Sequence, residues 1–377
     1  MDSTQLSVTC IAPVNIAVIK YWGKRNESLI LPINDSLSVT LSTADLCSKT
    51  KIIADAKFTD NVMILNGKEE NFENERIQRC VKEIKARAAE LGSCPKELLE
   101  WKIHIESENN FPTAAGLASS ASGYACLVYS LAQLYDLKKQ EISDIARMGS
   151  GSACRSIYGG FVQWQKGIQL DGKDSIAFQV APASHWPDLH VLILVVNDSK
   201  KKIGSTSGMA RSVVTSELIK YRVEKCVPQR IHSMTQAIKD RDFSKFAEVT
   251  MKDSNQFHAI CLDTFPPCVY MNDVSHEIVN YIHEFNRTEG ETKVAYTFDA
   301  GPNACLYLLE KNVKRVLSFV NHIFPNDNQK SAEYVRGIPV EYESEDVNEF
   351  QNYPQYEKNT LKYIIHTKVG EGPSRVD

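Results

Sequence analysis

The chain has 377 residues, of which 43% are hydrophobic and 24% charged, so it is no disordered protein and has room for one large or two ordinary domains. Lysine and arginine total 43 against 47 acidic residues, and a formal charge of −4 provides no global basic field for nucleic acid or an anionic membrane. No apolar run approaches the roughly 20 residues that cross a bilayer, and the first residues resemble no signal peptide.

Strands and helices are both predicted before residue 187. Residues 36–43 alternate apolar and hydroxyl side chains, which is typical of a half-buried strand. Residues 75–91 repeat apolar side chains at helical spacing, and Gly92 followed by Pro95 supplies the stop. The other elements expected in this half are strands at 8–11, 101–105 and 161–165 and helices at 118–135 and 140–148.

The second half is predicted to be richer in helices. A break at residues 186–188 precedes an apolar strand at 191–196 and divides the chain into domains 1–187 and 188–377. The elements expected after it are helices at 206–225, 228–239, 242–256, 272–285 and 313–324 and strands at 294–298, 304–309 and 361–367. The acidic, asparagine-rich residues 326–353 are expected to form a mobile insertion. The whole pattern predicts a mixed α+β protein in two domains.

Cysteine and histidine patterns give no sign of a metal centre. The ten cysteines stand in apolar contexts, with no C-x-x-C pair and no Cys/His cluster at zinc-finger spacing. The nine histidines are equally dispersed. We therefore expect reduced thiols in the core rather than disulfides or metal ligands.

A run of small residues between a predicted strand and a predicted helix, residues 109–123, is the most informative segment. Small side chains let backbone approach a ligand, and the start of a helix offers unpaired N–H groups to phosphate. Ser119 and Ser120 add hydroxyl donors. A tightly packed helix start is the equally open alternative. The run is neither a P-loop nor a dinucleotide-binding glycine turn.

Three further places combine charge with turns. The ammonium groups of Lys20 and Lys24 either bind a diphosphate or belong to a solvated basic surface. Arg155, in a segment of small and hydroxyl residues, can grip a carboxylate or cap the preceding helix. Asp299 follows an apolar strand before a Gly-Pro turn, so its carboxylate either projects into a cleft or caps the turn.

The pattern P-x-x-x-G-L-x-S-S-A at residues 112–121 is similar to the phosphate loop of the GHMP superfamily, named for galactokinase, homoserine kinase, mevalonate kinase and phosphomevalonate kinase. Residues 12–24, 150–156, 253–258 and 296–304 resemble, in order, the diphosphomevalonate decarboxylase family of that superfamily. The resemblance runs from about residue 7 to 310 and weakly into 369–373. It implies a two-domain GHMP-kinase-like α+β fold. The N-terminal domain would be like domain 2 of ribosomal protein S5, the C-terminal domain ferredoxin-like, and the active-site cleft would lie between them.

The resemblance also implies roles for individual residues. Asp299 is the expected catalytic aspartate, with Lys20 as its charge partner and Arg155 on the substrate carboxylate. The expected substrate contacts are Tyr21, Trp22, Gly23, Lys24, Arg76, Ser150, Gly151, Ser152, Ala153, Cys154, Arg155, Ser205, Thr206 and Met209. The expected nucleotide contacts are Asn109, Pro112, Ala115, Gly116, Leu117, Ala118, Ser119 and Ser120, and Ser120 is also the expected magnesium ligand. Gly204 stands where the family commonly has a further serine.

The implied reaction is the ATP- and Mg²⁺-dependent conversion of (R)-5-diphosphomevalonate into isopentenyl diphosphate, ADP, phosphate and carbon dioxide. A mevalonate-type kinase that stops at the phosphorylated product is one rival, and a catalytically silent relative that binds nucleotide is another. The resemblance suggests a homodimer. The charge balance and the lack of targeting and membrane-spanning signals predict a soluble cytoplasmic enzyme without nucleic-acid or membrane partners, although a peroxisomal address stays open.

Overall fold

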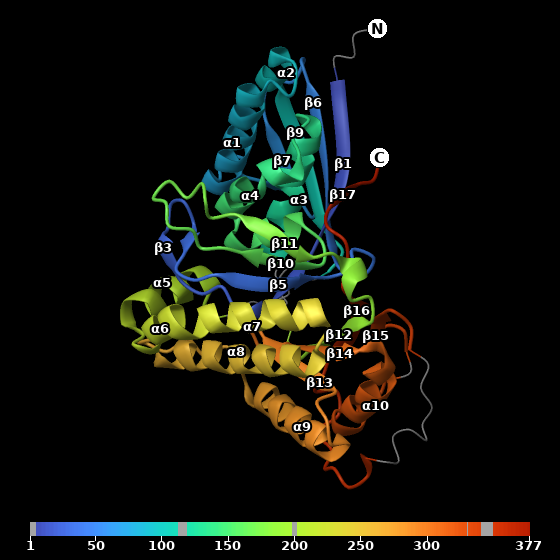
Figure 1. Ribbon diagram of the computed structural model, residues 1–377. Coiled ribbons are helices and arrows are strands. Elements are labelled where there is room, and N and C mark those ends of the chain that lie inside the picture. Colours follow the sequence, from blue (N-terminus) through green and yellow to red (C-terminus); the bar gives the residue numbers. More distant parts are fainter. Residues whose placement is uncertain (1–4, 112–118, 198–201, 330, 341–349) are drawn as a thin grey trace.

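The computed structural model describes residues 5–111, 119–197, 202–329, 331–340 and 350–377. In this part of the chain the strands form two large sheets, a four-stranded sheet between them and a small hairpin (Figure 1). None of the described helices is long and apolar enough to cross a membrane.

The first large sheet has the strand order β17-β1-β6-β9-β7-β8. Its strands are β1 (Gln5–Pro13), β6 (Cys47–Asp55), β7 (Val62–Leu65), β8 (Lys68–Glu70), β9 (Lys102–Asn109) and β17 (Ser374–Arg375). The helices of this half are α1 (Glu75–Leu91), α2 (Lys96–Glu100), α3 (Ser119–Leu134) and α4 (Ser143–Gly149). Because α3 packs across β1 and β6, the start of this helix lies at one edge of the apolar layer. The last strand, β17, pairs with β1, so the end of the chain returns to the first half.

The four-stranded sheet has the order β11-β10-β5-β2. Its strands are β2 (Asn15–Ile19), β5 (Ser36–Thr40), β10 (Phe161–Trp164) and β11 (Ala177–Ala181), and the hairpin beside it pairs β3 (Lys24–Asn26) with β4 (Leu31–Pro32). Every residue of β2 and β5 is buried. Both strands are therefore covered on each face, and the turn after β2 starts inside the molecule rather than on its surface.

The second large sheet has the order β13-β14-β12-β16-β15. Its strands are β12 (Leu189–Val195), β13 (Val294–Phe298), β14 (Ala304–Leu309), β15 (Val335–Gly337) and β16 (Tyr363–Lys368). The helices are α5 (Ser205–Thr215), α6 (Leu218–Tyr221), α7 (Val227–Asp240), α8 (Phe243–Asp263), α9 (Asp273–Glu289) and α10 (Val313–Ile323). Figure 1 shows α7 and α8 side by side beneath β5. Since α8 packs on both β2 and β13, it joins the four-stranded sheet to the second large one.

Several predicted elements match the structure closely. The predicted helix at 75–91 coincides with α1, where the Asn74 side chain caps the start and Gly92, with φ +60°, forms the left-handed end. The predicted strands at 294–298 and 304–309 coincide with β13 and β14. All ten cysteines are free, as expected.

The helix predicted over residues 206–225 is wrong. It breaks at Ser216, whose backbone is extended, because Asp263 accepts hydrogen bonds there from the Ser216 hydroxyl at 2.6 Å and the Leu218 N–H at 3.1 Å. After α6 the chain continues in a single π-helical turn, Arg222–Cys226, labelled η4. The prediction ran through this segment because its apolar spacing does not reveal a capping carboxylate that lies far along the chain.

The mobility expected for residues 326–353 stays a prediction, and residues 330 and 341–349 of this segment lie outside the described residues. Residues 335–337 form β15, which pairs in parallel with β16. Phe350 is buried and lies 5.1 Å, centroid to centroid, from the ring of Phe319. Tyr334 and Phe350 are buried parts of this segment, whereas Arg336 and Gly337 in β15 are exposed. The division of the chain near residue 187 stays a prediction.

Candidate active site

A cavity of about 890 Å³ is lined by segments that lie far apart in the sequence. They are the turn after β2, the start of α3, the 3₁₀ segment η2 (Gly151–Ile157), the start of α5 and the turn after β13. The lining residues are Asn15, Ala17, Lys20, Tyr21, Trp22, Lys24, Ile30, Arg76, Ser120, Ser150, Gly151, Ser152, Arg155, Lys202, Gly204, Ser205, Thr206, Ser207, Met209, Ala210, Phe257, Asp299 and Ala300.

Positive charge dominates the lining. Its cationic side chains are Lys20, Lys24, Arg76, Arg155 and Lys202, and among the described residues Asp299 is the lone carboxylate. Serine and threonine hydroxyls from α3, η2 and α5 surround these charges. A cavity with this excess of cations and hydroxyl donors suits a ligand that carries several negative charges, such as a phosphate ester.

Lys20 and Asp299 form an ion pair in the cavity lining. Lys20 follows β2 and Asp299 follows β13, and the Lys20 Nζ lies 2.6 Å from the Asp299 Oδ1. The lysine side chain is 3% exposed and the aspartate side chain 31%. The carboxylate is therefore the member of the pair that a ligand can reach. A carboxylate in this position can accept a proton from a bound ligand or stabilise positive charge on it.

Arg155 carries a buried charge that makes no ion pair with the described residues. The residue is 3% exposed, and its guanidinium donates to the Ser36 Oγ at 2.6 Å and to the Asn15 Oδ1 at 3.3 Å. No carboxylate lies within ion-pair distance of it in the described part of the chain, and its donors do not reach the carbonyls that end α4. Burial lowers the pKa of this guanidinium from its ordinary value. A buried cation without a protein anion is costly, and a bound anion would remove that cost.

Tyr21 presents a buried hydroxyl with no hydrogen-bond partner among the described residues. Its ring packs edge-on against Trp164, with the centroids 4.7 Å apart, and a side chain on Gly151 would place its Cβ 2.8 Å from the Tyr21 ring. Glycine at position 151 thus leaves room for the phenol. Burial raises the pKa of Tyr21. The hydroxyl therefore stays protonated and is available as a donor to an anion in the cavity.

The predicted phosphate loop is described only in part. Pro112, Ala115, Gly116, Leu117 and Ala118 lie outside the described residues. Ser119 is the first residue of α3, and Ser120 lines the cavity, with its Oγ 3.4 Å from the Ser150 Oγ. Asn109 does not line the cavity; its Oδ1 accepts a hydrogen bond from Ser48 at 2.5 Å.

Most of the other predicted contacts lie at the cavity. Ten of them line it: Tyr21, Trp22, Lys24, Arg76, Ser150, Gly151, Ser152, Ser205, Thr206 and Met209. Three do not, namely Gly23, Ala153 and Cys154. Gly23 has φ +98°, a conformation that glycine adopts without strain, so it shapes the turn. Ala153 and Cys154 are fully buried and point away from the cavity. Lys24 already pairs with Glu27 through a close contact.

The sequence analysis missed several lining residues, of which Asn15, Lys202 and Phe257 are the most informative. Asn15 is a polar residue inside an apolar strand, and its amide donates to the Ser156 Oγ at 2.8 Å. A polar residue within an apolar strand could have marked Asn15 as a candidate site residue from the sequence alone. Lys202 ends a run of three lysines, which reads equally well as exposed charge. Phe257 is one apolar residue among many on a helix, and no pattern distinguishes it.

Because of His258, on α8 beside the cavity, we expect the protein to lose stability in acid. Burial, followed by the nearby Lys20 charge, lowers the pKa of His258 to about 4. In the unfolded chain a histidine titrates near 6.5. As the pH falls below about 6.5, His258 binds a proton in the unfolded state but stays neutral in the native state. The free energy of unfolding therefore decreases until the pH reaches about 4.

We expect this one residue to account for about 3 kcal/mol of destabilisation between pH 6.5 and pH 4. The measurement is urea unfolding of the wild type and His258→Leu across that range. The wild type should lose more stability on acidification than the variant, whatever the stability of each at pH 7.5. Parallel pH profiles for the two proteins would contradict the prediction.

The chain is similar to known proteins over nearly its whole length. The family model described as "Diphosphomevalonate decarboxylase-like N-terminal domain" matches residues 12–177, and "Mevalonate 5-diphosphate decarboxylase C-terminal domain" matches residues 191–376. The diphosphomevalonate decarboxylase of Danio rerio is 53% identical over 375 residues, which cover 98% of this chain and 93% of that protein.

Solved structures agree. An X-ray structure of mevalonate 5-diphosphate decarboxylase matches with a TM-score of 0.88 and 45% identity, over 98% of this chain and 97% of the other. A structure described as MDDEF in complex with MVAPP, AMPPCP and magnesium matches with a TM-score of 0.77 and 31% identity, over 99% of each chain.

Proposed function

This chain belongs to the diphosphomevalonate decarboxylase family, and we propose that its cationic cavity is where the diphosphomevalonate and ATP react. The reaction is the ATP-dependent decarboxylation of (R)-5-diphosphomevalonate to isopentenyl diphosphate, ADP, phosphate and carbon dioxide. It requires a site that holds two polyanions together, and the excess of cations over carboxylates in this cavity supports that assignment.

The chemistry explains why ATP is needed. A tertiary hydroxide is a very poor leaving group, so the C3 hydroxyl is first converted into a phosphate ester. Loss of that phosphate leaves positive character at C3, and loss of the carboxylate as carbon dioxide supplies the electron pair of the new double bond. The protein contributes positioning of the two substrates and stabilisation of the developing charges.

We propose that Asp299 acts on the C3 hydroxyl. Its partly exposed carboxylate lines the cavity, where it can accept the hydroxyl proton before phosphoryl transfer. After the phosphate leaves, the same carboxylate lies near the cationic centre and stabilises it. Lys20, whose Nζ lies 2.6 Å from the Asp299 Oδ1, orients this carboxylate.

We propose that Arg155 holds the substrate carboxylate and that Tyr21 and Lys24 hold the diphosphate. Arg155 offers a planar pair of N–H donors and forms no ion pair with the described residues. The unpartnered Tyr21 hydroxyl is a donor beside it. Ser150 and Ser152 would contact the same substrate from η2, and Arg76, Ser205, Thr206 and Met209 would contact it from α1 and α5.

Mg²⁺ fits this site as an ion carried by the nucleotide. No group of three or more acidic, cysteine or histidine side chains that could cage a metal occurs among the described residues. Mg²⁺ bound with ATP commonly takes most of its oxygen ligands from phosphates and water, with few from the protein. When bound, it neutralises the charge of the triphosphate. We propose that the Ser120 hydroxyl, at the start of α3, supplies one ligand.

The buried charge of Arg155, with neutral partners only, is the observation that carries the proposal. The test is an assay with ATP, Mg²⁺ and diphosphomevalonate labelled at its carboxyl carbon, in which ADP and carbon dioxide are measured together. We expect equal amounts of the two. ADP without carbon dioxide would indicate a kinase that stops at the phosphorylated product, and nucleotide binding with neither product would indicate a silent relative.

The homodimer suggested by the resemblance and the cytoplasmic location expected from the sequence stay predictions. Sedimentation of the purified chain at micromolar concentration tests the first, and localisation of the tagged chain tests the second.

A further inference from the structure

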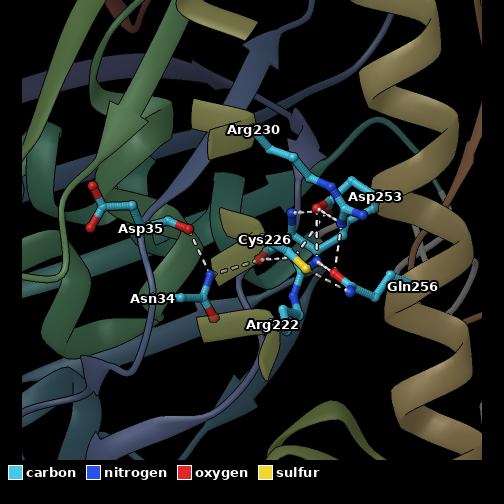
Figure 2. Close-up of polar contacts among 8 residues, drawn as sticks. Asn34, Asp35, Arg222, Cys226, Arg230, Asp253 and Gln256 are labelled. Atoms are coloured by element: carbon cyan, nitrogen blue, oxygen red, sulfur yellow. Dashed lines mark hydrogen bonds and ion pairs between the residues drawn. The ribbon is translucent and has the colours of Figure 1, made fainter. Parts of the chain in front are cut away.

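The sequence motif Asp253-Ser254-Asn255 has no part in the function proposed above, although α8 carries it against the cavity wall. Asp253 is fully buried. Its carboxylate accepts hydrogen bonds from Arg222 at 2.7 and 3.0 Å and from Arg230 at 2.9 Å. Figure 2 shows Asp253 projecting from its helix toward both guanidinium groups. Burial opposes the charge, yet the two arginines hold the pKa of this carboxyl below its ordinary value.

The same carboxylate binds the backbone of Lys20. The Lys20 N–H donates to the Asp253 Oδ2 at 2.8 Å. The Lys20 carbonyl accepts from the Arg222 Nη2 at 3.0 Å and from the Asn34 Nδ2 at 3.0 Å. Lys20 lies beyond the end of β2, where no strand partner satisfies its backbone. Side chains from elsewhere therefore fix both backbone polar groups of the residue that pairs with Asp299.

The next residue of α8 fixes the other side of the pair. The Ser254 Oγ accepts a hydrogen bond from the Phe298 N–H at 3.0 Å. Phe298 is the last residue of β13 and directly precedes Asp299. Asn255 continues the pattern, since its Oδ1 accepts from the Tyr296 hydroxyl on the same strand at 3.0 Å. Two consecutive residues of one helix thus hold the backbone of Lys20 and the backbone next to Asp299.

Arg222 reaches this network from the π-helical turn η4. Single π-helical turns are rare in proteins, and those that occur often lie at functional sites. The Gln256 Oε1, one turn of backbone from Asp253, accepts from Arg222 at 3.1 Å and from Arg230 at 2.7 Å, so the two guanidinium groups are themselves held in place (Figure 2).

We propose that Asp253 and Ser254 are positioning residues that set the distance between Lys20 and Asp299. The inference rests on the proposed function, because it assumes that this ion pair acts on the substrate. Neither residue lines the cavity. Their effect on the reaction must pass through the pair, since a shift of about 1 Å at reacting groups can lower a rate by about 10²-fold. A role limited to stability would lower turnover only through the fraction of folded enzyme.

The experiment is a double-mutant cycle on the full chain. Asp253→Asn is expected to lower kcat by about 10²-fold, with little change in KM for either substrate. Introduced into Lys20→Met, whose residual turnover is measured at raised enzyme concentration, Asp253→Asn should change kcat by no more than about twofold. The non-additivity is the signature of a residue that acts through Lys20.

Ser254→Ala provides the second cycle, because it removes one neutral hydroxyl and leaves the buried ion pairs intact, so the fold is retained even where Asp253→Asn destabilises it. It should lower kcat in the wild type and have no further effect in Asp299→Asn. Thr250→Ala is the matched control. Thr250 is a buried hydroxyl on the same helix that donates to the Phe246 carbonyl at 2.7 Å, and kcat should be unchanged.

The inference would be overturned if, in both cycles, the fold-losses of kcat caused by the two single substitutions multiplied in the double variant. A loss of kcat in Thr250→Ala as large as that in Ser254→Ala would also overturn it. Wild-type protein that releases no carbon dioxide would instead overturn the proposed function, which makes the two failures distinguishable. A raised KM at constant kcat in Ser254→Ala would likewise count against positioning and for a direct contribution to substrate binding.

Discussion

Replacement of Asp299 by asparagine is expected to lower kcat by about 10³-fold while leaving KM for both substrates nearly unchanged. Asparagine keeps the size of the side chain in the cavity lining but can neither accept the hydroxyl proton nor carry negative charge beside C3. ADP and carbon dioxide should therefore fall together, because phosphoryl transfer precedes decarboxylation. The measurement is steady-state turnover of both products, with substrate binding followed separately by calorimetry.

Two features of the structure sharpen this test. Lys20 is 3% exposed, so the variant leaves a buried ammonium group without its 2.6 Å partner and should also unfold more easily. Thermal unfolding separates this loss from the loss of chemistry. Asp327→Asn is the matched control, since Asp327 pairs with Lys358 at the surface and its variant should keep full turnover. Near-normal turnover in Asp299→Asn would remove Asp299 from the reaction.

The sequence predicted the elements whose signals are local. The helix at 75–91 combines apolar spacing with an asparagine cap and a final glycine, and the strands around Asp299 are bounded by a Gly-Pro turn. β6 escaped prediction because alternate buried positions, including Ser48 and Thr50, are polar. The Ser48 hydroxyl hydrogen-bonds to Ser122 on α3 and the Thr50 hydroxyl to Ser107 on β9, so a strand with a buried face looks hydrophilic in the sequence.

The candidate site was predictable in its residue types but not in its connections. The resemblance named Lys20, Arg155 and Asp299, yet only the structure shows that Lys20 pairs with Asp299 while Arg155 makes no ion pair with the described residues. The contact between Asp253 and Lys20 joins residues 233 positions apart, and a buried aspartate on a helix carries no local sign of what it binds. Such long-range polar contacts depend on tertiary packing, which the pattern of apolar residues determines only in outline.

Arg155→Ala should lower kcat/KM for diphosphomevalonate by about 10³-fold, through a raised KM and a lowered kcat. The side chain removed is a buried cation whose protein partners, Ser36 and Asn15, are neutral, so the variant leaves no unpaired charge behind and should fold. Because Arg155 is proposed to hold the carboxylate during the step that follows phosphoryl transfer, ADP should be released in excess over carbon dioxide. Arg155→Lys should restore little, since an ammonium group cannot reproduce the paired donors of the guanidinium. Equal product release at unchanged rate and affinity would return Arg155 to a structural role, whereas uncoupled ADP release would place it on the carboxylate that leaves.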